Sequence, residues 1–133
     1  MWENCKDMQD ELVTMRRELH RIPELGGVLP ETRAYVESKL KEYGIPFKEN
    51  ESDSGLTAEI EGASPGKTLA LRADMDALPI KEANEVCYKS EHEGCMHACG
   101  HDAHMTMLLG AAKVLAANRD KLKGKVRLIF QTA

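Results

Sequence analysis

The spacing of apolar residues changes along this chain, and the change restricts the folds that it can adopt. Apolar residues recur at helical intervals in three segments, at 3–21, 30–43 and 102–118. Short runs with strand character, separated by turns rich in glycine and proline, lie at 45–50, 56–60, 68–72 and 125–131. Helical segments in series with strands predict an α/β fold, in which helices pack on a mixed β-sheet.

Two of the predicted strands are apolar enough to be buried. Residues 68–73 are largely apolar, as in a strand that is covered on both faces, and residues 125–131 favour a central strand. The first of these strands runs directly into Asp74 and Asp76. Open α/β sheets place their sites at the carboxyl ends of buried strands, so both carboxylates are candidate site residues. The alternative is that they are solvated turn residues.

The composition excludes several classes of protein. Of the 133 residues, 42% are hydrophobic and 30% are charged, as in a globular domain. The net charge of −4 leaves no basic footprint for nucleic acid. No apolar run approaches the roughly 20 residues that span a bilayer, and the acidic N-terminus lacks the pattern of a signal peptide. We therefore expect no nucleic-acid or membrane partner, and a cytoplasmic location in which cysteines stay reduced or bind metal.

The segment 96–104, MHACGHDAH, concentrates groups that bind metal ions. It contains one thiol, three imidazoles and a carboxylate. Thiolate sulfur and imidazole nitrogen are both good ligands for zinc-type metals. Cys99 and His101 are two residues apart, so on a turning backbone their side chains can close on one metal site. Asp102 is also placed to act as the N-cap of the following helix, and His104 falls in the first turn of that helix.

A structural zinc site is the main alternative for this segment. Cys95, Cys99 and His101, with Cys87 as a further candidate, could hold zinc in a small binding module. Their irregular spacing lacks the paired C-x₂-C knuckles of zinc ribbons and fingers. The two kinds of site differ in their ligands, because a structural site is closed by four protein ligands whereas a catalytic site keeps open positions.

Four motifs in this chain resemble those of one family in their order and spacing. They are found at residues 17–26, 71–80, 96–102 and 126–131. The chain resembles the amidohydrolase branch of the aminoacylase and carboxypeptidase metallopeptidases. This branch includes hippurate hydrolases, N-acyl-amino-acid amidohydrolases and auxin-conjugate hydrolases. The motifs span nearly the whole chain but only about the first third of a family member.

The resemblance implies an enzyme that hydrolyses the amide bond of N-acyl-amino acids or peptides. It implies two divalent metals per complete site, zinc or manganese, with cobalt and nickel as further candidates. Cys99 and His101 match metal ligands of the family, and Asp76 matches the catalytic acidic residue that supports the ligands and the general base. The residues expected to hold these groups in place are Asp74, His97, Asp102 and His104.

The end of the sequence bears on the expected extent of the domain. The family continues with the motif F-Q-P-A-E-E, whereas this chain reads Phe130-Gln131-Thr132-Ala133 and stops. We therefore expect residues 1–133 to be the N-terminal portion of the catalytic domain, without the lid or dimerisation domain and inactive alone. We expect the strand at 126–131 to have an uncovered apolar edge or face, which would favour homo-oligomers. A catalytically silent, truncated paralogue is the alternative.

Overall fold

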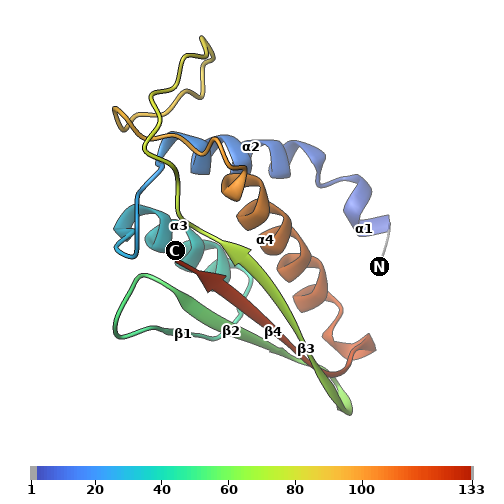
Figure 1. Cartoon of the computed structure of the whole chain (residues 1–133). Coiled ribbons are helices and arrows are strands. Elements are labelled where there is room, and N and C mark those ends of the chain that lie inside the picture. The colour runs from blue at the N-terminus through green and yellow to red at the C-terminus, as the bar shows by residue number, and fades with distance from the viewer. Residues whose placement is uncertain (1–2, 133) are drawn as a thin grey trace.

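The chain folds as four helices and a four-stranded sheet in the computed structural model, which describes residues 3–132 (Figure 1). The helices are α1 (Glu3–Lys6), α2 (Gln9–Arg21), α3 (Pro30–Glu42) and α4 (His101–Ala117), with a 3₁₀ turn at Arg119–Lys121. The strands are β1 (Phe47–Glu49), β2 (Leu56–Glu61), β3 (Ser64–Asp74) and β4 (Lys123–Gln131). The predicted α/β class is confirmed. The single helix predicted at 3–21 is instead two helices, because the chain turns at residues 7–8 and buries Met8.

The sheet is mixed, with the strand order β1-β2-β4-β3. β2 pairs with β1 and β4 in antiparallel fashion, whereas β3 and β4 are parallel, with Leu71 opposite Leu128 and Asp74 opposite Gln131. The connection between the two parallel strands contains a long loop and α4, as parallel pairing requires. β4 is central, as predicted.

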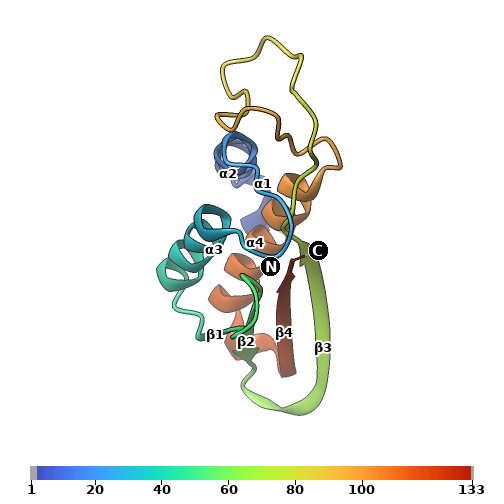
Figure 2. The same ribbon diagram turned by 60° about the vertical axis from the view of Figure 1, so that its left-hand side comes forward.

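The prediction that residues 68–73 are covered on both faces is wrong. β3 is the edge strand of the sheet that the structure describes, and most of its residues are exposed, including Leu69 at 59%. α4 packs against β3 from one side only, and Figure 2 shows the helices on that side of the sheet. Only the carboxyl end of β3 is well covered, where Ala73 and the following Met75 are buried.

The core lies between the helices and the covered face of the sheet. α4 contacts α2, α3 and strands of the sheet, so its apolar stripe is enclosed from several directions. The predicted stripe is confirmed by the buried residues of this helix, which include Met105, Leu108, Leu109 and Ala112. The sheet and the other helices contribute further buried side chains, among them Leu19, Val36, Leu40, Leu128 and Phe130.

Two contacts away from the site stabilise the fold, a close backbone approach at Gly124 and a set of hydrogen bonds to Glu24. Gly124 has φ 78, and a Cβ there would lie 2.0 Å from the backbone oxygen of Lys67, so β3 and β4 can approach only at a glycine. The buried carboxylate of Glu24 accepts hydrogen bonds from the Thr32 amide and hydroxyl, both at 2.7 Å. It thereby satisfies donors in the first turn of α3.

Candidate metal centre

Two segments far apart in the sequence meet at the carboxyl end of β3. The chain leaves β3 at Asp74, passes Asp76, and returns through a loop that rises above α2 before it enters α4 (Figure 1). His101 is the first residue of α4, and His104 lies in its first turn. Gly100 occupies the N-cap position with φ 90, a conformation that other residues rarely adopt, so the glycine permits this sharp entry.

Asp76 holds the ring of His101 in a fixed orientation. The His101 Nδ1 atom lies 2.8 Å from the backbone oxygen of Asp76 and 3.1 Å from its Oδ1 atom. Both partners accept hydrogen bonds, so Nδ1 carries the proton and the lone pair of a neutral ring is on Nε2. This is the arrangement by which proteins orient a metal-binding histidine, with the second nitrogen left for the metal.

The free side of His101 faces two further ligand groups. Its Nε2 atom lies 4.0 Å from Asp74 Oδ2, and His104 Nδ1 lies 3.8 Å from the same oxygen. Asp74, His101 and His104 each offer an atom within 4.8 Å of the others, which is the only such group of three among the residues that the structure describes. Arg72 binds the other oxygen of Asp74 at 2.5 Å. Asp74 and His104, expected to hold the ligands in place, therefore lie close enough to be ligands themselves.

Cys99 lies beside this group and is exposed to solvent. Its Sγ atom is 3.8 Å from the backbone oxygen of Asp76, the same oxygen that accepts from His101. Cys87, Cys95 and Cys99 are free thiols. Among residues 3–132, none of Cys87, Cys95 and Cys99 belongs to a group of three or more close ligands, whereas His101 does. The structure therefore does not form the closed zinc site that the sequence left open.

Asp102 is not the N-cap of α4, contrary to the prediction. The helix begins at His101, one residue before Asp102, and Gly100 occupies the N-cap position. The side chain of Asp102 is fully buried instead. Its Oδ2 atom lies 2.7 Å from His20 Nδ1 and 2.9 Å from Arg16 Nε, so it is taken up by contacts with α2. Sequence reasoning assigned no role to His20 or Arg16. The available signal was that they lie four residues apart on one face of a helix, next to the buried Leu19.

His97 is buried beside the centre without a hydrogen bond. His97 is 3% exposed, and neither of its ring nitrogens has a hydrogen-bond partner among the described residues. Burial lowers the pKa of His97 to about 4, and the nearby His20 and His101 act in the same direction against Asp102 and Asp76. The ring is therefore neutral at physiological pH.

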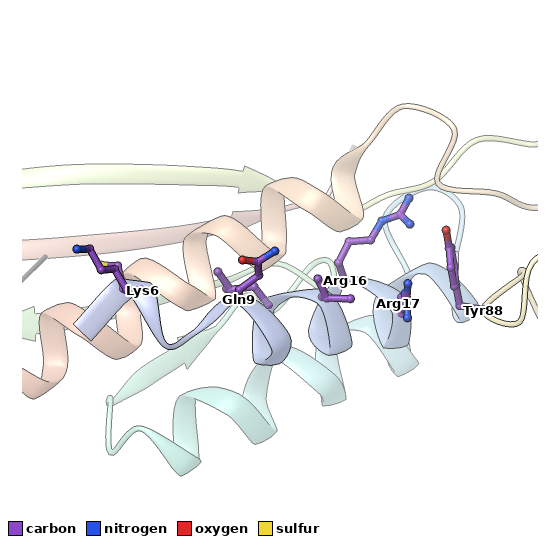
Figure 3. Close-up of a pocket in the computed structure, with 8 residues that line it drawn as sticks. Lys6, Gln9, Arg16, Arg17 and Tyr88 are labelled. Carbon is purple, nitrogen blue, oxygen red and sulfur yellow. The ribbon is translucent and has the colours of Figure 1, made fainter. Parts of the chain in front are cut away.

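A separate groove lies along the exposed side of α2. Its volume is about 670 Å³, and Figure 3 shows its polar lining residues Lys6, Gln9, Arg16, Arg17 and Tyr88. None of the residues that line it belongs to the Asp74, His101 and His104 group. Arg16 connects this groove to the first turn of α4, because its guanidinium also binds Asp102.

Comparisons with known proteins find relatives that match nearly the whole chain. Residues 70–133 match the model of Peptidase family M20/M25/M40. The chain is 48% identical to N-acetyl-L-cysteine deacetylase of Bacillus subtilis (strain 168) and 39% identical to N-acyl-L-amino acid amidohydrolase of Geobacillus stearothermophilus. These matches cover 98% and 96% of this chain, but only 31% and 34% of the relatives. The chain thus spans about one third of their length.

Solved structures show the same fold. The Bacillus subtilis YXEP protein, described as a dinuclear metal-binding peptidase of the M20 family, superposes with a TM-score of 0.91 at 42% identity. The match covers 96% of this chain and 36% of that protein. An aminohydrolase from methicillin-resistant Staphylococcus aureus superposes with a TM-score of 0.93 at 40% identity, over 98% of this chain and 34% of that one.

Proposed function

This chain is a homologue of the M20/M25/M40 peptidases, and we propose that residues 1–133 form the N-terminal, metal-binding portion of an N-acyl-amino-acid amidohydrolase domain. The observation that carries the proposal is the ring of His101, which Asp76 holds with Nε2 turned toward further ligand groups. An imidazole fixed in this way is suited to a metal rather than to a purely structural hydrogen bond.

The donor atoms fit a divalent metal with a mixed ligand set. Cys99 and His101 would hold it, with Asp74 and His104 as neighbouring donors. Zinc suits thiolate and imidazole ligands, whereas manganese suits carboxylate ligands. Such a metal makes water more acidic and polarises a carbonyl group, which is what amide hydrolysis requires at neutral pH. Asp76 keeps the tautomer and direction of His101, and the Arg72 guanidinium donates a hydrogen bond to one oxygen of Asp74.

The proposed substrate follows from the relatives. Two of them are named for the hydrolysis of N-acyl or N-acetyl amino acids, so a small N-acyl-amino acid or peptide is the expected substrate of the whole protein. No helix among residues 3–132 is long and apolar enough to cross a membrane. The cytoplasmic location remains a prediction, and so does the homo-oligomer, for which the exposed edge strand β3 is the candidate surface.

Cobalt(II) binding tests the proposed ligands, because a thiolate ligand adds a charge-transfer absorption to the spectrum. Wild-type protein should bind the ion and show this band. Cys99→Ser should lose the band, and His101→Ala should bind the ion at least tenfold more weakly. Cys87→Ser is the matched control and should behave as wild type. Equal loss in Cys87→Ser and Cys99→Ser would instead support a structural zinc site.

Hydrolysis is the second measurement. Since the chain matches about one third of its relatives, activity is best assayed in a polypeptide of their length that carries residues 1–133 in the matching third. We expect release of free amino acid from N-acetyl- and N-benzoyl-amino acids with zinc or manganese. Cys99→Ala and Asp76→Ala should abolish most of it. Activity that survives Cys99→Ala unchanged would show that the site is elsewhere.

A further inference from the structure

A buried histidine on α2 joins the two segments that carry the proposed metal ligands. His20 is 2% exposed and lies near the end of α2. Its Nδ1 atom is 2.7 Å from Asp102 Oδ2, and its Nε2 atom is 3.1 Å from Glu82 Oε1. Asp102 directly follows His101 in the first turn of α4, and Glu82 lies in the loop that leads to Cys99.

Both carboxylates also accept hydrogen bonds from other donors. Asp102 accepts from Arg16 at 2.9 Å and from the amide of Ala103 at 2.9 Å. Glu82 is fully occupied in the same way, since its two oxygens accept from the Ser90 amide at 2.7 Å and the Asn84 side chain at 3.2 Å.

Burial raises the pKa of Glu82, but the hydrogen bonds from Ser90, His20 and Asn84 outweigh this effect and lower it. The two ring nitrogens of His20 each lie within hydrogen-bond distance of a carboxylate, so the ring bridges Asp102 and Glu82.

Stability alone does not account for such a group of charges. Removing charges from water costs several kcal/mol per ion in general, and replacing a buried ion pair by apolar residues is often neutral or stabilising. In some proteins buried ionic groups instead fix one arrangement of the elements that they join. In this protein His20 contacts Asp102 and Glu82, which belong to the segments that carry the proposed ligands.

The loop itself has few other means of holding its position. Residues 75–100 contain no helix or strand, apart from an isolated bridge between Leu78 and Met96. Glu82 fastens this loop through Ser90 and Asn84, and the ring of Tyr88 lies edge-on to His20 at 5.7 Å. The imidazole is thus the common anchor for the loop and for the start of α4.

We propose that His20 is a positioning residue for the metal centre, which sets the place of His101 through Asp102 and that of the Cys99 loop through Glu82. This inference rests on the proposed function, because it assumes that Cys99 and His101 bind the metal. His20 does not touch the metal or the substrate; it acts through its two carboxylate partners.

Two conservative substitutions separate the two hydrogen bonds. The amide nitrogen of Asn superposes on Nδ1 of histidine, so His20→Asn keeps the bond to Asp102. The amide nitrogen of Gln superposes on Nε2, so His20→Gln keeps the bond to Glu82. Each variant retains a polar group that can satisfy one buried carboxylate. His92→Asn is the matched control, because His92 also binds the chain at Pro23 but has no bond to Asp102 or Glu82.

The measurements are the cobalt(II) dissociation constant, the thiolate-to-cobalt absorption and the urea midpoint of the purified protein. We expect His20→Gln to weaken cobalt binding about 10–100-fold, the usual effect of removing the groups that orient a metal ligand. His20→Asn should weaken it less than His20→Gln at a similar urea midpoint, because Asp102 adjoins His101. His92→Asn should bind cobalt as wild type does.

The outcomes distinguish the inference from the proposed function. A purely structural role would lower the urea midpoint of both variants and leave the affinity of the folded protein unchanged, which would overturn the inference. Wild-type affinity and absorption in both folded variants would overturn it as well. If wild-type protein fails to bind cobalt, the proposed function is what fails. If wild type binds cobalt and Cys99→Ser loses the absorption, the proposed ligands stand whatever the result for His20.

Discussion

The substitution His97→Leu should make the protein more resistant to acid. His97 is 3% exposed and has two unpartnered ring nitrogens, and its pKa is lowered to about 4 from an ordinary value of 6.5. Above pH 6.5 the ring is neutral in both the folded and the unfolded chain, so it adds no pH dependence. Below pH 6.5 the unfolded chain binds a proton that the folded protein does not accept until about pH 4. Stability is therefore lost as the pH falls through this window.

The size of the effect follows from the same two values. The difference between a pKa of 6.5 in the unfolded chain and about 4 in the folded protein corresponds to at most about 3 kcal/mol of folding stability. About 2–3 kcal/mol of this stability is lost by pH 4.5. His97→Leu removes this contribution and leaves those of the other titrating groups. At pH 7.5 the variant should be as stable as wild type or about 1 kcal/mol more stable, because a similarly sized apolar side chain replaces an unpartnered polar one.

Urea unfolding at pH 7.5 and pH 4.5, in the presence of a chelator, measures both quantities. The decrease in midpoint between the two pH values should be about 1–2 M smaller for His97→Leu than for wild type, given ordinary urea dependence for a chain of this size. His97→Gln stays polar but does not titrate. Its urea midpoint should therefore also decrease less between pH 7.5 and pH 4.5 than the midpoint of wild type. Parallel pH profiles for wild type and both variants would refute the reasoning.

Three further predictions test other parts of the structure. Gly124→Ala places a Cβ 2.0 Å from a backbone oxygen of β3 and should destabilise the protein by more than about 3 kcal/mol in urea, whereas Gly44→Ala, with φ 65 and open space, should cost about 1 kcal/mol. Glu24→Ala leaves the amide and hydroxyl of Thr32 without their acceptor and should cost about 1–3 kcal/mol, measured in the same way. Asp76→Asn should weaken cobalt(II) binding about 10–100-fold with little change in the urea midpoint, and unchanged affinity would argue against its orienting role.

The local features of this protein could be predicted from its sequence. The periodicity of apolar residues identified α3, α4 and the strands, because it depends on which side of one element must be buried. The central position of β4 followed from its apolar character in the same way. The four motifs led to the resemblance to the amidohydrolases, and two proteins named as deacetylase and amidohydrolase share 48% and 39% of the residues with this chain.

The errors concern contacts between distant parts of the chain. β3 is apolar at 68–73 but lies at the edge of the described sheet, because burial depends on which elements flank a strand and not on its own residues. Asp102 has the right residue type and place for a helix N-cap, yet it pairs with His20, 82 residues earlier in the sequence. Neither outcome can be read from a local pattern.

The candidate metal centre shows the same division. The sequence placed Cys99, His101 and His104 in one short segment and Asp74 and Asp76 in another, and so indicated the chemistry of the site. Only the tertiary structure turned Nδ1 of His101 onto Asp76, brought Asp74 within 4.0 Å of its other nitrogen, and placed His20 behind the centre. Residue types determine which ligands are available, whereas the packing of α4 against β3 and α2 determines which atoms meet, since that packing joins segments that the sequence keeps far apart.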